Sequence, residues 1–432
     1  MPPILDHVLV LGGSAAGMLA AGAIAPHVRR VTLVERDVLA GSGPRKGLPQ
    51  ARHANNLTPV ACTLMEGWFP GIIDALVAAG ATSLDPGGDA IWVLGDRPLA
   101  RASLGRRTLL ASRALLDGAL RDRLRSRPGL VVRDGVPATG LAGTARAITG
   151  VTVRGADGDE TIAADLVVDA SGRGSRVVAW AAGLGASRPP EQRYRVGVRY
   201  ATRIFRGRRA PDGVAMIVVA ATAARPRGAV AFAIEDARWL VTTFGYGGEA
   251  PPPALADFRR FVAELQVPAL DAIAAAEPLD DGAVIGFGDT ARVGLERWRD
   301  APDGLVVLGD AACALNPCYG RGITAAALQV DALVRELARG GPGLPGRSHR
   351  AVAAAAAPVF ELQQSIDAAI PGVTGAVDAT PPPIRWLVRR ARRVGERDPV
   401  VARTILQIGG CEAPRSRLLR PDVLWRVLRA AG

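Results

Sequence analysis

The 432-residue sequence has few aromatic residues, four cysteines and a single lysine, Lys46. No apolar run reaches the ~18 residues that a membrane-spanning helix needs. The first residues lack the basic region and apolar core of a signal peptide, so we expect no export. The cysteines form no CxxC pair and no zinc-like grouping with the four histidines. This pattern favours reduced thiols in a cytoplasmic protein without a bound metal.

What the sequence has in excess is positive charge, and that charge is unevenly distributed. The formal net charge is +12, but residues 384–432 hold twelve arginines and four acidic residues, which leaves +4 for residues 1–383. No surface of basic and aromatic residues accompanies the charge, so we expect no binding to nucleic acid. The tail is predicted to be helical, with one apolar face and a basic face turned away from it; the apolar face has Leu387, Ala391 and Val394, and the basic face has Arg389, Arg390, Arg392 and Arg393.

The amino-terminal segment predicts a strand–helix–strand unit. Residues 7–11 are an apolar run of strand length, and residues 12–17 read Gly-Gly-Ser-Ala-Ala-Gly. A stretch of small residues with helical character follows, and a second apolar strand covers residues 31–34. This order of elements is the βαβ unit of dinucleotide-binding folds.

Within that unit, four residues suit a bound dinucleotide. Gly12 permits the tight turn, the small Ser14 admits a diphosphate, and Gly17 lets the helix pack closely on the strand. Glu35 follows Gly17 by 18 positions, near the spacing of about 20 expected for an acid that binds a ribose. The alternative interpretation is a βαβ crossover that simply uses small residues.

Two further segments place turns of small residues after buried strands. Residues 165–175 read DLVVDASGRGS, and residues 309–324 read GDAACALNPCYGRGIT. Open α/β sheets bind ligands at the carboxyl ends of their strands. Asp310 offers a carboxylate for a ribityl or ribose hydroxyl, and the glycine-rich end of the second segment offers free N–H groups ahead of a helix predicted over residues 322–337. Taken alone, either turn is also explained by a structural role.

Together these motifs resemble the flavoprotein monooxygenases that carry one FAD-binding Rossmann domain, the group A-like type. The resemblance is nearest to the squalene-epoxidase-like and polyether epoxidases, with flavin halogenases and geranylgeranyl reductases as relatives. It covers about residues 5–340, and it includes the runs RKGLPQARH at 45–53 and SRALL at 112–116. It implies FAD as the cofactor.

The fold implied by the resemblance is α/β. We expect an FAD-binding Rossmann-like domain of the glutathione-reductase type, an inserted antiparallel β-sheet domain for the substrate, and a helical carboxyl-terminal tail. The FAD-binding domain is expected to be discontinuous, over residues 1–75, 100–182 and 291–340. The substrate domain then takes residues 76–99 and 183–290, and the tail takes residues 341–432.

The resemblance also implies which residues contact each part of the cofactor. It implies that Gly12, Ser14, Ala16 and Gly17 line the diphosphate, that Glu35 binds the adenosine ribose, and that Arg36 flanks the adenine end. It implies that Val136 and Ala170 border the adenine and that Arg45 and Arg113 reach the diphosphate and ribityl region. It further implies that Asp310 holds the ribityl chain and that Gly320, Gly322 and Ile323 face the isoalloxazine. The alternative interpretation of Arg45 and Arg113 is that each forms an ion pair at the protein surface. No metal ligand and no catalytic side chain is assigned.

The implied activity is the insertion of one oxygen atom from O2 into a small molecule, by epoxidation or hydroxylation in specialised metabolism. Reduced flavin and O2 form a C4a-hydroperoxide with an electrophilic terminal oxygen, so the protein has to orient the substrate and exclude water. Few charges interrupt the strands predicted between residues 194 and 246, which favours a bulky apolar substrate. The alternatives are a reductase, a halogenase, and a cyclase or scaffold that uses FAD without net redox. The halogenase signature Trp-x-Trp-x-Ile-Pro is missing from the sequence, which argues against halogenation.

The electron donor stays open at this point. In aromatic hydroxylases an Asp-Gly pair links flavin and NADPH binding, and Ser171 replaces that glycine here. No second GxGxxG motif follows in the sequence. The reductant, NADPH or NADH, therefore acts directly or through a separate flavin reductase.

The arginine-rich tail has two open interpretations. Its basic faces suit contact with an anionic membrane, which agrees with a lipophilic substrate. The alternative, which we favour, is that the tail helices cap the FAD domain and expose their arginines to solvent. The expected partners are then an apolar small molecule, O2 and, where needed, a flavin reductase.

Overall fold

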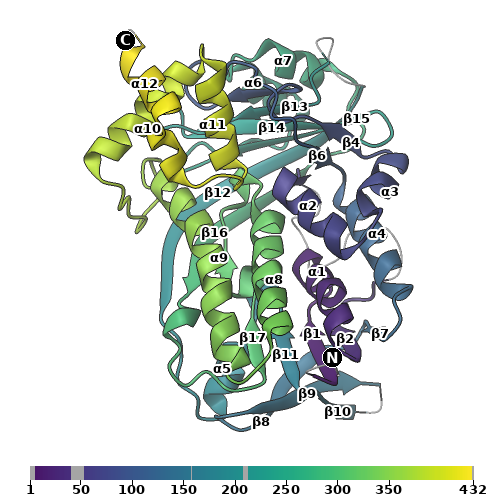
Figure 1. Ribbon diagram of the computed structural model, residues 1–432. Coiled ribbons are helices and arrows are strands. Elements are labelled where there is room, and N and C mark those ends of the chain that lie inside the picture. Colours follow the sequence, from purple (N-terminus) through teal and green to yellow (C-terminus); the bar gives the residue numbers. More distant parts are fainter. Residues whose placement is uncertain (1–4, 40–52, 157, 208–212, 431–432) are drawn as a thin grey trace.

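Two β-sheets organise the chain, one near the amino-terminal end of the molecule and one near the other end (Figure 1). The structure is a computed structural model that describes residues 5–39, 53–156, 158–207 and 213–430. The first sheet is parallel and the second is mostly antiparallel. This arrangement confirms the expected fold class, an α/β domain with an inserted antiparallel sheet and a helical tail.

The parallel sheet holds five strands in the order β17-β11-β1-β2-β7. Most of its residues are buried, because helices cover parallel sheets on both faces, and this explains the short uninterrupted apolar runs in the sequence. The strands are β1 (His7–Leu11), β2 (Arg30–Val34), β7 (Leu130–Arg133), β11 (Leu166–Asp169) and β17 (Leu305–Val307). Because all five run in one direction, the turns that follow them meet at one edge of the sheet.

Helices pack around this sheet and join it to two small three-stranded sheets. Helices α1 and α8, far apart in the sequence, lie against each other, and α8 lies beside α9 (Figure 1). The helices are α1 (Ala15–Ile24), α2 (Pro59–Trp68), α3 (Ile72–Ala78), α4 (Arg113–Arg125), α5 (Val177–Gly183) and α8 (Gly322–Arg339). The small sheets are β10-β9-β8 and β3-β6-β4, made of β3 (Asn56–Leu57), β4 (Thr82–Leu84), β6 (Thr108–Leu110), β8 (Ala138–Gly143), β9 (Ile148–Gly155) and β10 (Gly158–Ala163).

The second large sheet has seven strands in the order β18-β16-β12-β15-β14-β13-β5. One face packs on helices α6 (Leu255–Ala263) and α7 (Pro268–Ala275) through Phe205, Trp239 and Phe258. The other face presents Tyr200, Phe244 and Tyr246. The strands are β5 (Ala90–Val93), β12 (Glu191–Arg206), β13 (Met216–Val219), β14 (Arg227–Ile234), β15 (Arg238–Gly245), β16 (Ala283–Val293) and β18 (Cys313–Ala314).

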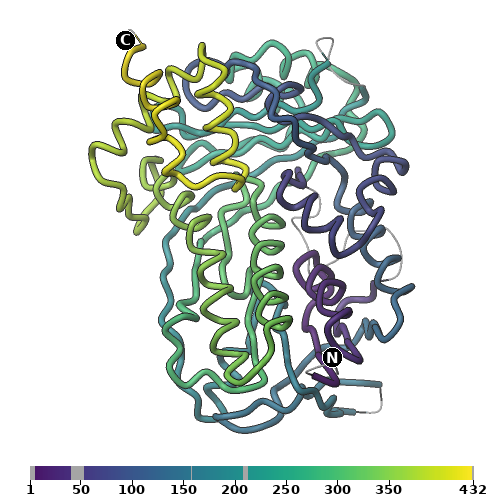
Figure 2. Tube along the Cα trace, in the orientation of Figure 1, coloured from purple at the N-terminus to yellow at the C-terminus, as the bar shows by residue number. Residues whose placement is uncertain are grey.

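The tail begins with the long helix α9 (Leu344–Asp367), which contributes to the cores on both sides of the molecule. The helices after it are α10 (Pro382–Gly395), α11 (Pro399–Gly409) and α12 (Pro421–Arg429). These last three helices lie at the end of the molecule opposite to β1 (Figure 2). Ala402 and Leu406 pack on Leu99, which follows β5. The expectation that these helices cap the FAD domain is therefore wrong. Their apolar side chains pack on the segment that follows β5, a strand of the second large sheet.

Most local expectations agree with the structure. The amino-terminal strand–helix–strand unit is confirmed, and the helix predicted over residues 322–337 extends to Arg339. All four cysteines are free, with Cys62 and Cys313 buried. Within the described residues no single helix has the length and composition of a membrane span; α2 and α3, bent by 112°, pass that test only as a pair.

Two helical glycines allow a test of the packing around the parallel sheet. A methyl group added at Gly22 in α1 would lie 2.0 Å from the Phe69 ring, whereas one at Gly118 in α4 would meet nothing nearer than 3.9 Å. We expect Gly118→Ala to raise the free energy of unfolding by about 0.5–1 kcal/mol through helix propensity. We expect Gly22→Ala to lower it by about 1–3 kcal/mol through overpacking. Urea unfolding of both variants checks this, and equal effects would contradict it.

Candidate functional site

A cavity of about 1100 Å³ extends from the carboxyl edge of the parallel sheet to the apolar face of the seven-stranded sheet. Its first part is lined by the turns that follow β1, β2, β11 and β17. Its second part is lined by strands β13 to β16 and by the tail helices α10 and α11. The cavity therefore connects a region of exposed backbone groups with a region of apolar side chains.

The turn after β1 is shaped by close contacts between backbone segments. Gly12 has a φ of +102°, and a Cβ there would lie 2.5 Å from the Ala170 carbonyl oxygen. A Cβ at Gly17 would lie 1.7 Å from the Gly12 carbonyl oxygen. Ser14 begins α1 without a side-chain cap, so the first N–H groups of the helix stay open toward the cavity. Such a helix start favours a bound anion such as a diphosphate.

Glu35 stands at the carboxyl end of β2, next to this turn. Its two carboxylate oxygens accept hydrogen bonds from the backbone N–H of Gly13 (2.5 Å) and of Asp37 (2.9 Å). The side chain is 9% exposed and borders the cavity. Each oxygen keeps a further lone pair, so the carboxylate can still accept from the two hydroxyls of a ribose.

Arg113 reaches the same region from the start of α4. Its guanidinium forms an ion pair with Asp117 at 2.9 Å, with both side chains buried, and Nη2 lies 3.4 Å from the Ser14 hydroxyl. The alternative of a surface ion pair is therefore wrong for Arg113, because the pair is buried at the cavity wall. Arg45, its predicted companion, lies outside the described residues.

The turns after β11 and β17 place two aspartates in different roles. Asp169 is buried and accepts hydrogen bonds from the Ser171 N–H (3.0 Å) and from the hydroxyls of Ser171 and Ser175 (2.5 Å each), which fixes the turn. Asp310 instead borders the cavity, and no hydrogen bond or ion pair to it is found among the described residues. Burial raises the pKa of Asp310, with the charges of Arg173 and Arg113 opposing that effect. This carboxylate is available to a ligand hydroxyl.

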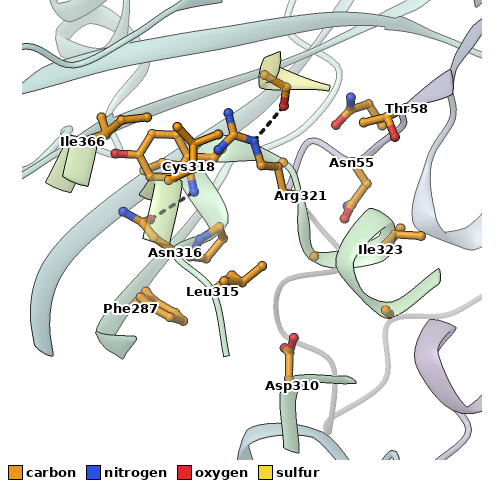
Figure 3. Close-up of a pocket in the computed structure, with 18 of the residues that line it drawn as sticks. Asn55, Thr58, Phe287, Asp310, Leu315, Asn316, Cys318, Arg321, Ile323 and Ile366 are labelled. Atoms are coloured by element: carbon orange, nitrogen blue, oxygen red, sulfur yellow. Dashed lines mark hydrogen bonds between the residues drawn. The ribbon is translucent and has the colours of Figure 1, made fainter. Parts of the chain in front are cut away.

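The loop between β18 and α8 forms the junction between the two parts of the cavity (Figure 3). Gly320 has a φ of +61°, and a Cβ there would lie 2.6 Å from Oδ1 of Asn56. Gly322 and Ile323 begin α8, whose first turn carries no side-chain cap. The first N–H groups of α8 are therefore available to a ligand at this point of the cavity.

A buried carboxylate supports this loop from behind. Asp367, at the end of α9, accepts hydrogen bonds from the hydroxyls of Tyr319 (2.7 Å) and Tyr194 (2.9 Å) and from Nδ2 of Asn316 (3.0 Å). Nδ2 of Asn316 also donates to the Tyr246 hydroxyl at 3.0 Å. Burial raises the pKa of Asp367 to about 6, and its hydrogen-bond donors work against that rise. This network joins the loop, the seven-stranded sheet and the tail.

The wall that the seven-stranded sheet gives to the second part of the cavity is mostly apolar. Met216, Val230, Phe232, Ile285 and Phe287 from the seven-stranded sheet line it. This arrangement agrees with the few charges seen in these strands.

Two other side chains near that wall are held neutral by burial. His53 contacts the Thr202 hydroxyl at 2.5 Å through Nδ1, and burial lowers its pKa to about 4. Burial raises the pKa of the Cys318 thiol to about 12, and the thiol donates to the Tyr200 hydroxyl at 3.4 Å. Neither group carries a charge at neutral pH.

The structure brings twelve of the fourteen predicted cofactor contacts to the wall of one cavity. These are Gly12, Ser14, Ala16, Glu35, Arg36, Arg113, Val136, Ala170, Asp310, Gly320, Gly322 and Ile323. Gly17 packs against the Gly12 carbonyl rather than at the cavity wall, and its contact with a diphosphate stays a prediction. The prediction that Arg389, Arg390, Arg392 and Arg393 all face away is wrong for two of them, because Arg389 and Arg392 line the cavity.

Sequence reasoning missed the network around Asp367 and the arginines of the tail that enter the cavity. The loop motif at residues 316–322 contained one signal, Asn316, whose side chain is fully buried. Asp367 sits in a helix of 24 residues without any recognisable motif. Only the folded position of that helix brings its last turn behind the loop.

The fold and this site define the chain as a protein with the flavin-dependent monooxygenase and halogenase fold. It superposes on the flavin-dependent brominase Bmp2 with a TM-score of 0.69, at 16% identity, over 98% of this chain and 100% of that one. It superposes on p-nitrophenol 4-monooxygenase PnpA from Pseudomonas putida DLL-E4 with a TM-score of 0.64, at 17% identity, over 95% and 98%. At these identities the likeness shows the fold alone.

No protein-family model matches the sequence. The chain is 31% identical over 430 residues to Protein Rv3254 of Mycobacterium tuberculosis (strain ATCC 25618 / H37Rv), which covers 93% of this chain and 89% of that protein. The chain belongs to the family of Protein Rv3254.

The raised pKa of Asp367 makes the stability of the protein depend on pH. Because its folded pKa of about 6 lies above the ordinary 3.8, folding takes up a proton between these pH values. Stability therefore falls as the pH rises through this window, by at most about 3 kcal/mol. We expect Asp367→Asn, which cannot ionise, to lose less free energy of unfolding than the wild type between pH 4 and pH 6.5. Urea titrations measure this.

The control for this experiment is Asp422→Asn, which removes an exposed carboxylate at the start of α12. It should keep the pH dependence of the wild type. If the free energy of unfolding changes equally with pH in the wild type and in Asp367→Asn, then Asp367 does not titrate in this range.

Proposed function

We propose that the chain is an FAD-dependent monooxygenase that inserts one oxygen atom from O2 into a largely apolar small molecule, by epoxidation or hydroxylation in specialised metabolism. The observation that carries this proposal is the single cavity that joins the dinucleotide-type turns of the parallel sheet to the apolar face of the seven-stranded sheet. A cofactor held in the first part would present its reactive end at the loop before α8, where the second part begins.

The residues at the first part of the cavity fit FAD. The turn at Gly12 and the uncapped start of α1 would hold the diphosphate, with Arg113 beside it. Glu35 would accept from the ribose hydroxyls, and Asp310, which lacks a partner among the described residues, would accept from the ribityl chain. The backbone at Gly320 and Gly322, ahead of the uncapped start of α8, would face the isoalloxazine.

When bound and reduced, FAD supplies the activation of O2. The overall reaction takes substrate, O2, two electrons and two protons, and it gives the oxygenated product and water. The work of the protein is to orient the substrate and keep water away from the reacting atoms. The apolar wall of Met216, Phe232 and Phe287 serves this purpose, and the Asp367 network holds the loop in place.

The two electrons come from NADPH or NADH, directly or through a separate flavin reductase, and this is part of the proposal. Ser171 turns its hydroxyl inward to Asp169, so it serves the turn after β11. With serine in place of the glycine of the Asp-Gly pair, the side chain at position 171 takes part in holding this turn. This supports a donor route other than the one used by aromatic hydroxylases.

The first test is whether the protein binds FAD at this site. The purified protein should show the visible absorption of bound flavin, or regain it on reconstitution. We expect Gly17→Ala to weaken FAD binding by about tenfold or more, because the 1.7 Å contact displaces the Gly12 turn from the diphosphate. Gly118→Ala, in an open position of α4, is the matched control and should bind FAD normally. A protein that stays colourless after reconstitution overturns the proposal.

The second test is the fate of O2. Flavin in the holoprotein is reduced with NADPH or NADH under labelled O2, or with dithionite in the absence of O2, followed by removal of the excess and addition of labelled O2. Apolar candidate substrates are screened by mass spectrometry. Incorporation of one labelled oxygen atom supports a monooxygenase. Halide incorporation, anaerobic reduction of a double bond, or turnover that ignores the flavin redox state would each favour another activity of this fold.

A further inference from the structure

Among the residues that the structure describes, five arginines line the tail end of the cavity, and two of them, Arg385 and Arg389 on α10, are exposed. The other three come from separate segments. Arg321 precedes α8, Arg392 lies in the middle of α10, and Arg415 opens the short turn between α11 and α12. All three are half-buried. They belong to the part of the cavity beyond the loop at Gly320, on the side away from the diphosphate turn.

The hydrogen bonds of these guanidinium groups are few and go to neutral groups. Arg321 donates through Nε to the Gly409 carbonyl at 3.0 Å, and its buried Nη1 finds no partner in the part of the chain that the structure describes (Figure 3). Arg415 donates to the hydroxyls of Thr380 (3.4 Å) and Ser365 (3.1 Å). For Arg392 no side-chain hydrogen bond is found among the described residues. Donor groups therefore remain free at this end of the cavity.

The acidic residues nearby are engaged elsewhere. Asp378 lies 3.6 Å from Arg385, and Glu412 lies 3.5 Å from Arg106. Asp367 is already surrounded by tyrosine and asparagine donors. Within residues 5–39, 53–156, 158–207 and 213–430, none of the three arginines has a carboxylate within 4 Å. The three positive charges thus share a partly buried space without an ion pair.

The pKa shifts of the three arginines also indicate positive charges that lack a compensating anion. Burial lowers the pKa of Arg321, Arg392 and Arg415, and the charge of Arg321 lowers the pKa of the other two further. Glu361 and Asp378 act in the other direction on Arg415, and Asp367, Tyr319 and Cys411 do so on Arg321. Like charges held together in a desolvated site are costly unless an anion completes them. Planar guanidinium groups suit the oxygens of a carboxylate or a phosphate.

We infer that Arg321, Arg392 and Arg415 form an oxyanion subsite that binds an acidic group of the substrate. The inference rests on the proposed function, because it places the substrate in the second part of the cavity. The substrate is then amphipathic, with an apolar body against β13 to β16 and a carboxylate or phosphate at the arginines. The sequence predicts a bulky apolar substrate, and this inference changes the prediction to an apolar molecule that carries an acidic group.

The test uses three naphthalene probes of similar size on the full chain, after its flavin spectrum has been recorded. These are 1-naphthoate, 1-naphthyl phosphate and the neutral 1-naphthamide, and binding is measured by isothermal titration calorimetry. We expect at least one acid to bind about tenfold or more tightly than the amide. Whether the carboxylate or the phosphate binds more tightly identifies the acidic group.

The matched variants are neighbours in α10. Arg392→Gln should abolish most of the preference for the acid, as should Arg415→Gln, while binding of 1-naphthamide stays unchanged. Arg393→Gln, which removes an exposed arginine outside the cavity, should keep the full preference. Equal binding of acids and amide, or a preference that survives both Arg392→Gln and Arg415→Gln, overturns the subsite.

These outcomes separate the two proposals. A yellow protein without a preference for acids retains the flavin function and loses the subsite. A colourless protein whose preference for acids depends on Arg392 and Arg415 retains the subsite and loses the flavin function.

Discussion

The close approach of three backbone segments at the edge of the parallel sheet is the constraint on which the rest depends. Gly12 contacts the backbone at Ala170, and Gly17 packs against the carbonyl of Gly12 at a distance that excludes any Cβ. This contact fixes how β1, β11 and α1 meet, and thereby the place where the first N–H groups of α1 open into the cavity. A side chain at either glycine would move the helix start and the cavity wall together.

Electrostatic balance differs between the two parts of the cavity. The first part offers helix starts and one unpartnered carboxylate, Asp310, and it suits a ligand that brings both phosphates and hydroxyls. The second part has apolar walls that end in a group of arginines. The Asp367 network lies between the parts and contributes a carboxylate whose donors are all uncharged. The loop at Gly320 is therefore held by hydrogen bonds rather than by an ion pair.

The first part of the site could be predicted from the sequence because its signals are local. A strand, a glycine turn and Glu35 lie within about thirty residues, and their spacing is set by the βαβ unit itself. Asp310 was predictable because it directly follows a buried strand. The large antiparallel sheet was predictable from short apolar runs, although β12 is far longer than the apolar run within it.

The tail could not be placed in the same way. Helix α10 packs on α11 and α12 through Leu387 and Ala391, and it also borders the cavity. Because two of its faces are covered, its sequence of apolar and charged residues does not separate one buried face from one exposed face. Arg392 follows Ala391 directly and falls on the second inner face. Asp367 likewise acquires its partners from a loop about fifty residues earlier in the chain. Such contacts depend on tertiary placement, which spacing along one helix does not encode.

The bond from Arg321 to the Gly409 carbonyl has a consequence for how the protein matures. It ties the loop at Gly320 to the end of α11, about ninety residues later in the chain, and α10 and α11 line the cavity. During translation the parallel sheet can form before these helices leave the ribosome. The cavity thus lacks one wall until α10 and α11 have been made and have packed in place.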